Sequence, residues 1–379
     1  MSKVEELLAK YNPNGVFQSD LREVSSIIRG KRVTKRDVKE RGDYPVISGG
    51  ESPMGYYDTF NREANTITIA QYGAAGYVDF QKNKFWANDV CYSILPFESV
   101  NNKYLYYTLK SKQNYIYSIR NTDAVPFSLP INTLYSIQIP LPHIKVQEEI
   151  VKILDSFTNL IDALNEELSL RQKQFEYYRE KLLTFDDKSL LKPINEIGTL
   201  FRGNGLQKKD FVEEGVGCIH YGQIYTKLGF SLSKPLTYVT KVTAKPLTKV
   251  RKGDLVIACT SENIEDVCKS VVWEGEEEIV TGGHACVLRH NENPRYIGYF
   301  FQTHQFFMQK KQYAYGAKVI DIKTEKLGEI LIPIPPLAIQ QSIVEKLDAF
   351  EFLISSLKEE IALRQKQYEY YREKLLTFN

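Results

Sequence analysis

Two long stretches of the chain place apolar residues at alternating intervals of four and three, the period of a coiled coil. Each stretch follows a proline-rich entry, "IPLPHIKVQ" or "IPIPPLAIQ", and then runs for about forty residues without Gly or Pro. The pattern therefore predicts two long helices. The first seam consists of Ile150, Leu154, Phe157, Ile161, Leu164, Leu168, Phe175, Tyr178 and Leu182, and the second of Ile343, Leu347, Phe350, Ile354, Leu357, Ile361, Tyr368, Tyr371 and Leu375.

Two seams in one chain most simply pair with each other. Since each helix leaves a different globular segment, an antiparallel pair is expected to carry the two segments at opposite ends of a rod. Each seam is interrupted once by an arginine, Arg171 in the first and Arg364 in the second. These side chains either reach out of the seam to solvent or fix the register of the pair. We favour the register role, because one polar seam residue can specify pairing.

The helical stretches belong to an internal repeat. Residues 139–185 align without a gap on residues 332–378, with 29 identities in 47 positions. A weaker match opens each half, where "LREVSSIIRGKRVTKRDV" from Leu21 resembles "INEIGTLFRGNGLQKKDF" from Ile194 and shares its Arg-Gly pair. The second half carries about twenty additional residues between these two matches. The chain therefore reads as a duplication.

The duplication predicts an α+β fold: two mixed α/β globular domains joined by two long antiparallel coiled-coil helices, with an internal pseudo-two-fold repeat. We call residues 15–138 the first variable segment and residues 188–331 the second variable segment. The predicted domain boundaries are 1–140 for the first globular domain, 141–187 for its helix, 188–333 for the second globular domain and 334–379 for the last helix.

The repeat preserves more of each helix than seam packing requires. "LRQKQFEYYREKLLTF" from Leu170 and "LRQKQYEYYREKLLTF" from Leu363 differ at one position, although most of their residues point away from the seam. A charged face that is merely solvated, or recent gene conversion, would explain this. We favour a docking surface that each copy presents to one of two identical partners, because exposed Tyr and Arg are typical of interfaces. The predicted docking residues are Tyr177, Tyr178, Arg179, Tyr370, Tyr371 and Arg372.

Composition places the chain among globular proteins of a reducing compartment. It has 379 residues with 43% hydrophobic content, and its first twenty residues lack the apolar stretch of a signal peptide. Its five cysteines include no C-x-x-C pair, and no apolar run is long enough to cross a bilayer. A cytoplasmic location without membrane contact is predicted. Cys218, His220, His284 and Cys286 could supply four metal ligands, but short residues alternating along strands are commoner, so no metal is predicted.

Charge divides between the parts of the chain. The first variable segment holds 15 Lys+Arg against 12 Asp+Glu and the second 20 against 16, whereas residues 139–187 hold 6 against 10. "RGKRVTKRDVKER" and "KVTAKPLTKVRK" concentrate the positive charge, which favours polyanion binding, although a single run of this kind is usually a solvated loop. The candidate DNA-binding residues are Arg29, Lys31, Arg32, Lys35, Arg36, Gln71, Tyr72, Lys82, Lys84, Arg202, Lys208, Lys209, Lys245, Lys249, Arg251 and Lys252.

The remainder of the variable segments is rich in Tyr, Asn, Gln, Ser and Gly. Short β-branched or aromatic runs such as Thr66–Ala70 and Leu255–Thr260 predict strands joined by loops. Such loops can place amide and guanidinium groups against base edges, while lysines hold phosphates. The same composition also suits carbohydrate binding.

Motifs of catalysis are missing from the sequence. It has no GxxxxGK[ST] phosphate loop, no Asn-Pro-Pro-aromatic tetrapeptide of a methyltransferase and no Glu-x-Lys of a nuclease site. We therefore predict that the chain performs no chemistry and binds no cofactor. This leaves a DNA-binding protein, a tandem-module scaffold or carbohydrate-binding protein stiffened by a coiled coil, and, least favoured, a stand-alone modifying enzyme. Salt-dependent binding to duplex DNA would separate the first from the second.

The combination resembles the specificity (S) subunits of type I restriction-modification systems over the whole chain. The resemblance lies in the paired "IPLP…Q…I" and "IPIPP…Q…I" entries and in the two "LRQKQ-aromatic-EYYREKLLTF" helix ends. It implies that each variable segment is a target-recognition domain for one half of a bipartite, asymmetric double-stranded DNA target, and that the helices set the distance between the halves. It also implies two methyltransferase subunits, which use S-adenosylmethionine, and restriction subunits, which use ATP. The short polar N-terminal segment departs from the expected symmetry.

Overall fold

The computed structural model describes residues 2–123 and 125–378 and contains two compact units. The first unit comprises Met1–Glu166 and Glu359–Asn379, and the second comprises Glu167–Lys358. Each unit therefore holds one variable segment, the beginning of the helix that follows it and the end of the other helix. The sequence-based boundaries follow chain order, whereas these units follow contacts and divide both helices. No helix in the described part of the chain is both long and apolar enough to span a membrane.

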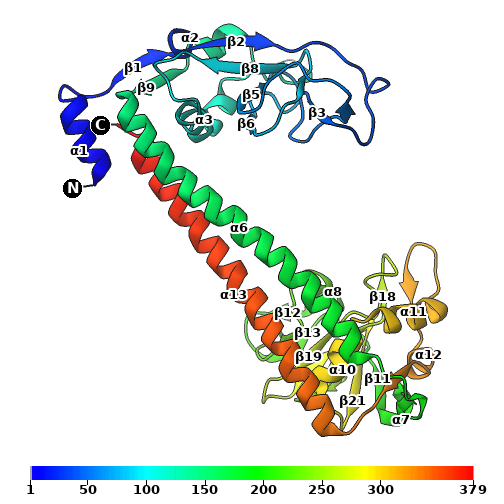
Figure 1. Cartoon of the computed structure of the whole chain (residues 1–379). Helices are drawn as coiled ribbons and strands as arrows, with labels where there is room; N and C mark the ends of the chain where they lie inside the picture. The colour runs from blue at the N-terminus through cyan, green and yellow to red at the C-terminus, as the bar shows by residue number, and fades with distance from the viewer. Residues whose placement is uncertain (1, 124, 379) are drawn as a thin grey trace. The chain divides into compact units, whose positions relative to one another are not determined.

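The two predicted helices form as single elements. Helix α6 covers Ile144–Leu183 and α13 covers Leu337–Leu376, 40 residues each (Figure 1). The proline-rich entries are partly strands, since Gln138–Leu141 form β9 and Leu331–Pro333 form β23. The prolines then stop each strand, because they cannot donate a ladder hydrogen bond.

The seam residues pack as an antiparallel pair in both units. In the first unit Phe157 of α6 stacks on Tyr371 of α13, with ring centroids 5.3 Å apart. In the second unit Tyr178 of α6 stacks on Phe350 of α13 at 5.4 Å. The beginning of each helix therefore meets the end of the other, which confirms the predicted pairing. The two stacks are also equivalent under the repeat.

The N-terminal helix α1, Lys3–Tyr11, belongs to the first unit. Ser2 and Glu5 form a capping box at its start. Val4 is buried in one apolar cluster with residues from the beginning of α6 and the end of α13, and Figure 1 shows α1 next to both. Lys3 adds an ion pair with Glu149 at 2.8 Å. The short N-terminal segment therefore does pack beside a long helix.

The described part of the first variable segment is built on two sheets, the β1–β9 strand pair and four short helices. Its buried core lies between the larger sheet, in the order β2-β8-β5-β6, and helices α3 to α5. The smaller sheet has the order β4-β3-β7, and β1 pairs with β9. The predicted strand Thr66–Ala70 is β5. The other elements are β1 Phe17–Asp20, α2 Leu21–Val24, β2 Ser25–Arg29, β3 Tyr44–Ile47, β4 Tyr56–Tyr57, β6 Val78–Gln81, β7 Trp86–Ala87, β8 Cys91–Pro96, α3 Asn102–Ser111, α4 Gln113–Ser118 and α5 Ile131–Tyr135.

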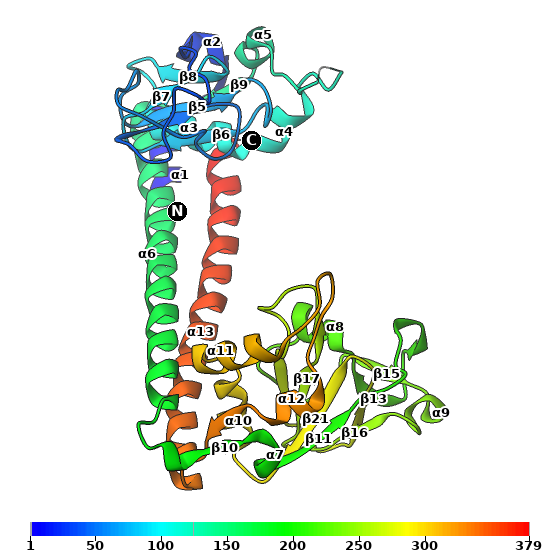
Figure 2. The ribbon, with the colours of Figure 1, turned by 90° about the vertical axis from the view of Figure 1, so that its right-hand side faces the viewer.

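The second variable segment repeats this plan with additions. Its sheets have the orders β11-β21-β17-β19-β14 and β12-β15-β13-β20-β16, and β10 pairs with β23. Figure 2 shows α10 between the first of these sheets and α13. The predicted strand Leu255–Thr260 is divided between β17 and β18.

The elements of the second variable segment are η1 Lys188–Leu190, β10 Leu191–Pro193, α7 Ile194–Ile197, β11 Gly198–Arg202, η2 Lys208–Asp210, β12 Phe211–Val212, β13 Val216–Ile219, α8 Tyr221–Thr226, β14 Ser231–Leu232, β15 Thr237–Val239, α9 Lys241–Ala244, β16 Thr248–Val250, β17 Leu255–Ala258, β18 Thr260–Ser261, β19 Ser270–Trp273, β20 Ile279–Thr281, β21 Ala285–His290, α10 Pro294–Phe300, α11 His304–Tyr313, β22 Ile320–Asp321 and α12 Thr324–Gly328. The additional residues of this half lie mainly between β13 and β17.

The repeated Arg-Gly pair occupies one place in both segments. Arg29 ends β2 opposite Tyr92 of β8, and Arg202 ends β11 opposite Cys286 of β21. A Cβ atom on Gly30 would lie 2.1 Å from the carbonyl oxygen of Ala87, and one on Gly203 would lie 2.2 Å from that of Gly282. Glycine is required at both positions because another backbone segment passes too close for a side chain.

A second repeated motif joins each variable segment to the helix that follows it. Asn101-x-Lys-Tyr-x-x-Tyr at the start of α3 corresponds to Asn293-x-Arg-Tyr-x-x-Tyr at the start of α10. The hydroxyl of Tyr107 donates to Asp155 of α6 at 2.7 Å, and that of Tyr299 donates to Asp348 of α13 at 2.5 Å. The first asparagine of each motif donates its backbone N–H to a buried glutamine, Gln147 or Gln340, at 2.8 and 3.0 Å.

A cation completes each carboxylate site. Lys103 donates to Asp155 at 2.7 Å, and Arg295 donates to Asp348 at 2.9 Å. Burial raises the pKa of Tyr107 and of Tyr299, so both hydroxyls keep the proton that they donate. We call each set of Tyr, cation and Asp a carboxylate lock. The motif was not found by sequence comparison, because only its spaced polar and aromatic positions are repeated.

Removing the carboxylate from either lock should destabilise its unit. Asp155→Ala or Asp348→Ala removes the carboxylate that accepts from a buried tyrosine hydroxyl and from a cation, which should lower the free energy of unfolding by about 1–3 kcal/mol. Urea denaturation followed by circular dichroism measures this change. Glu166→Ala and Glu359→Ala are matched controls, because these residues are exposed and equivalent in the repeat. Equal stability of lock and control variants would contradict the role given to the locks.

Candidate nucleic-acid interface

The basic run of the first variable segment forms an exposed loop after β2. Lys31, Arg32, Lys35 and Arg36 are exposed, whereas Val33 between them is buried. The backbone of Val33 exchanges two hydrogen bonds with the side chain of Asn88, at 3.0 and 3.2 Å. The loop is therefore anchored at its centre, and its four cations point away from the core. Such an arrangement suits contact with phosphates.

Arg29, Gln71 and Tyr72 come together at the end of the larger sheet. Arg29 donates to the side-chain oxygen of Gln71 at 2.5 Å, and its guanidinium lies 5.8 Å from the centre of the Tyr92 ring. Gln71 is buried, whereas the neighbouring Tyr72 is exposed. Arg29 is thus held by its own domain. It can present its remaining N–H groups in a defined direction, as readout of base edges requires.

Lys82 and Lys84 are paired with carboxylates. Lys82 lies 3.2 Å from Asp162 of α6, and Lys84 lies 3.0 Å from Glu63. All four side chains are well exposed, so these pairs contribute about 0–1 kcal/mol each and can open without a large cost. The structure separates these two lysines from the basic loop, and their role in DNA binding stays a prediction.

Most candidates of the second variable segment also have partners. Arg202 donates to Asp321 at 3.2 Å, and Arg251 donates to Glu278 at 2.9 Å. Lys252 is paired with Glu276, and Lys249 donates to the backbone oxygen of Ala244. Several cations of the run "KVTAKPLTKVRK" are therefore bound by groups of their own domain. Lys208, Lys209 and Lys245 are exposed and have no hydrogen-bond or ion-pair partner among the described residues.

A pocket of about 350 Å³ near Lys208 contains residues that the sequence reasoning did not select. Lys208, His220, Tyr221 and His284 line it. Sequence reasoning considered the two histidines only as metal ligands together with Cys218 and Cys286. In the structure these four residues do not form a metal site, and the described part of the chain contains no group of three or more His, Cys, Asp or Glu suited to one. The Gly282–Gly283 pair directly before His284 is the sequence feature that could have pointed to this loop.

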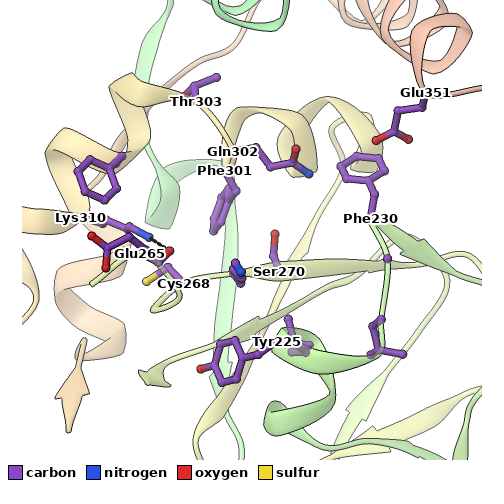
Figure 3. Close-up of a pocket in the computed structure, with 15 residues that line it drawn as sticks. Tyr225, Phe230, Glu265, Cys268, Ser270, Phe301, Gln302, Thr303, Lys310 and Glu351 are labelled. Carbon is purple, nitrogen blue, oxygen red and sulfur yellow. Dashed lines mark hydrogen bonds between the residues drawn. The ribbon is translucent and has the colours of Figure 1, made fainter. Parts of the chain in front are cut away.

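A larger cavity of about 540 Å³ lies in the same unit, lined by parts of α8, α11 and the residues before β19 (Figure 3). The ammonium of Lys310 is buried there and donates to the backbone oxygens of Glu265 and Val267, at 2.9 and 2.6 Å. Burial raises the pKa of the Cys268 thiol, which keeps it protonated. The cation and the thiol of this cavity therefore serve the fold, and none of the candidate DNA-binding residues lines it.

The predicted docking residues do not all face outward. Tyr177 and Tyr370 are exposed, whereas Tyr178 stacks on Phe350 in the seam; Tyr371 stacks on Phe157 but is still 40% exposed. Arg179 lies over the Phe175 ring and donates to Gln302 at 3.3 Å. In the second copy, Arg372 lies over the ring of Tyr368. The repeated arginines are thus packed against their own units.

The two seam arginines bond along their own helices. Arg171 donates to Gln174 and Glu167, at 3.1 and 3.4 Å. Arg364 donates to Gln367 and Glu360, at 2.9 and 2.7 Å. Such contacts suit side chains that reach along the helix surface toward solvent. A role in register stays a prediction.

The two polar, basic globular segments and their long helices suit a DNA-binding protein, and comparison with known proteins identifies the family. A family model described as "Type I restriction modification DNA specificity domain" matches residues 13–170 and again residues 191–363. The chain therefore belongs to the specificity subunits of type I restriction-modification systems, whose function is to recognise a DNA sequence.

Individual relatives agree with this assignment. A putative type I restriction enzyme specificity subunit of Haemophilus influenzae is 29% identical over 380 residues, covering 95% of this chain and 94% of that protein. The EcoR124I/EcoR124II specificity subunit of Escherichia coli is 30% identical over 296 residues, covering 73% and 70%. The crystal structure of a type I S subunit from M. genitalium shares the fold, with a TM-score of 0.64, 17% identity and coverage of 96% of both chains. The family and the fold class expected from the sequence are thus confirmed.

The basic loop should carry much of the salt-dependent part of DNA binding. Changing Lys31, Arg32, Lys35 and Arg36 to Ala should weaken binding and reduce the slope of log affinity against log salt by roughly 0.9 for each phosphate that is no longer neutralised. Arg29 is left intact, because its bond with Gln71 belongs to the fold. Fluorescence anisotropy at several salt concentrations measures the slope. The control replaces Lys152, Lys346, Lys358 and Lys366, four exposed lysines of the long helices. An unchanged slope in the loop variant would place the phosphate-binding surface elsewhere.

Proposed function

We propose that each variable segment reads one half of a bipartite, asymmetric DNA target. The observation that supports this most is the shared frame of the two segments with different side chains at one corner. In the first segment this corner carries Arg29, Gln71 and Tyr72. Arg202 occupies the same register in the second, but Cys259 and Thr260 stand in place of Gln71 and Tyr72, and Thr260 bonds with Asp321 and His284. One backbone frame with two sets of polar groups would recognise two different base sequences.

The chain is proposed to leave all chemistry to other subunits. Adenine methylation with S-adenosylmethionine would belong to two methyltransferase subunits, and ATP-dependent translocation and cleavage would belong to restriction subunits. We also place the chain in the cytoplasm, where its five cysteines, all free and buried, would stay reduced. Recovery of the protein in the soluble cytoplasmic fraction of its own cells checks this location.

Exchanging one variable segment should change one half of the target. Replacing residues 17–141 by the corresponding segment of a relative moves the β1–β9 pair as a whole and should alter one half-site while leaving the other unchanged. The donor segment should carry the Asn-x-Lys/Arg-Tyr-x-x-Tyr motif, so that it can form the lock with Asp155. Sequencing of methylated adenines in cells that also make the methyltransferase reads the result. A change in both half-sites would refute modular recognition.

We further propose that the helices set the number of unspecified base pairs between the half-sites. Each helix has 40 residues and measures about 60 Å at 1.5 Å per residue. Insertion of one heptad after Leu164 and one after Leu357 adds about 10 Å and keeps every seam residue inward. The spacer in the methylated target should then grow by roughly one to three base pairs.

A four-residue insertion into one helix is the matched control for the heptad insertions. It rotates the following apolar face by about 40° and should abolish activity by breaking the seam. If the heptad variant folds and still methylates the original spacing, the helices do not set the spacer.

The outer faces of the long helices support docking of two equivalent partners. Leu170 and Tyr177 are each 59% exposed, and their repeat equivalents Leu363 and Tyr370 are 57% and 60% exposed. Residues seven apart lie on one face of a helix, so each pair forms a small apolar patch. The proposed docking surface therefore includes the two leucines as well as the two tyrosines. Arg179 and Arg372 pack inward, so we propose that they hold this surface in place and do not contact the partner.

Charged residues in these patches should remove one methyltransferase at a time. The variant with Leu170→Glu and Tyr177→Glu, and the variant with Leu363→Glu and Tyr370→Glu, should each bind one methyltransferase subunit in place of two. Native mass spectrometry of the reconstituted complex counts the subunits. Ser169→Glu and Ala362→Glu serve as controls, because each adds a negative charge about 100° away from the patch on its helix. Binding of two subunits by both patch variants would show that docking uses another surface.

A further inference from the structure

The pocket of about 350 Å³ in the second unit brings together two histidines that lie far apart in the sequence. His220 precedes α8, and His284 precedes β21. The ring of Tyr221 contacts both imidazoles, with centroid separations of 4.6 Å to His220 and 5.0 Å to His284. Lys208 lines the same pocket, and Lys209 is exposed next to it. Two imidazoles with cations beside them are the groups that contact bases and phosphates.

The hydrogen bonds of His220 determine which of its nitrogens carries the proton. Its Nδ1 accepts from the backbone N–H of Gly222 at 3.1 Å, as the cap of α8. Burial lowers the pKa of His220, and the positive charge of Lys208 lowers it further. The ring is therefore neutral with its proton on Nε2. This N–H has no acceptor among the described residues, although His220 is more than nine-tenths buried. The pocket thus contains a fixed hydrogen-bond donor.

The hydrogen bonds of His284 place its proton on Nδ1, the nitrogen that is the acceptor in His220. The hydroxyl of Thr260 donates its single proton to Asp321 at 2.9 Å, so its oxygen must accept from Nδ1–H of His284 at 3.1 Å. In the neutral ring Nε2 is then an acceptor. Asp321 is itself held by Arg202 at 3.2 Å. A chain from Arg202 through Asp321 and Thr260 therefore orients the imidazole of His284.

The backbone of His284 has a strained conformation that the shared fold of the two segments does not require. Its φ is +69°, in the left-handed region where a residue other than glycine is uncommon. The corresponding position of the first segment is Val90, whose carbonyl accepts from Gln71 as that of His284 accepts from Cys259. Val90 is not among the residues with positive φ. A strained histidine that is exposed, oriented and in one pocket with a second imidazole indicates a functional position.

We propose that His220 and His284 determine part of the DNA specificity of the second variable segment by reading the major-groove edge of one adenine. Nε2–H of His220 donates to N7, and Nε2 of His284 accepts from the N6 amino group. Adenine offers this acceptor and donor side by side, whereas guanine offers two acceptors and cytosine one donor. Lys208 and Lys209 hold the adjacent phosphates. The assignment rests on the proposed function, because it requires this segment to read one half-site.

Base analogues test each hydrogen bond separately. The target is first determined from methylated DNA, and the second half-site is the half that changes when residues 188–331 are exchanged. Binding of the specificity–methyltransferase complex is then measured on duplexes with 7-deazaadenine or purine at single adenines of that half. Loss of N7 or of the amino group at one adenine should weaken wild-type binding by roughly 5- to 150-fold.

Two variants assign these losses to the histidines. His220→Asp keeps side-chain oxygens that can cap α8 and has no N–H donor, so 7-deazaadenine should no longer weaken binding. His284→Gly accepts the positive φ and removes the imidazole, so purine should no longer weaken binding. Analogues in the first half-site should weaken wild type and variants equally, which also shows that the variants are folded.

Three outcomes overturn the assignment: analogue penalties that persist in both variants, analogues without effect in the wild type, and a second half-site without adenine. If instead exchange of residues 188–331 leaves the target unchanged, the proposed division of the target fails, and the histidine assignment fails with it.

Discussion

The carboxylate locks are the interaction on which the remaining structure depends. In each unit an aspartate on the long helix accepts from a tyrosine and from a cation of the variable segment, Asp155 in the first unit and Asp348 in the second. The lock joins a segment that reads bases to the helix that carries it. Because burial keeps the tyrosine protonated, the donor and the acceptor cannot both become charged. A segment could change its loops freely and still keep its orientation on the helix through this lock.

The same division between constant frame and variable surface recurs at the corner of each segment. Gly30 and Gly203 admit a crossing backbone that no side chain would tolerate, and the arginine before each glycine ends an edge strand of its sheet. The frame is therefore set by sterics and strand register, both of which act through the backbone. The side chains around the arginines are free to differ, and they do. This explains how one fold can hold two different sets of polar side chains without loss of its core.

Net charge describes the surface of this protein poorly. The second segment has the larger excess of cations, yet Arg202, Arg251 and Lys252 are paired within the domain. In the first segment the four cations of the loop after β2 point into solvent, because Val33 and Asn88 hold the loop by its backbone. Counting basic residues in a run does not distinguish these cases. The distinction depends on which acidic residues the fold brings near each cation.

The sequence by itself determined the features that follow from local patterns of residues. The heptad spacing revealed both helices and their antiparallel seam, the duplication revealed two similar halves, and the repeated helix ends indicated the family. The strand at Thr66–Ala70 followed from its β-branched residues. Periodicity and identity are properties of neighbouring residues, so they can be read without knowing how the chain folds.

Only the tertiary structure decided which distant residues meet. The bond between Arg29 and Gln71, the contact of His220 and His284 with one tyrosine ring and both carboxylate locks depend on strand register and on the placement of a helix against a sheet. Arg179 has the composition of an interface residue, yet it packs inward because the Phe175 ring and Gln302 lie beside it. A shift of one residue in register would turn each strand side chain to the other face of its sheet. Local sequence does not determine the strand register, because the contacts that fix it come from segments far along the chain.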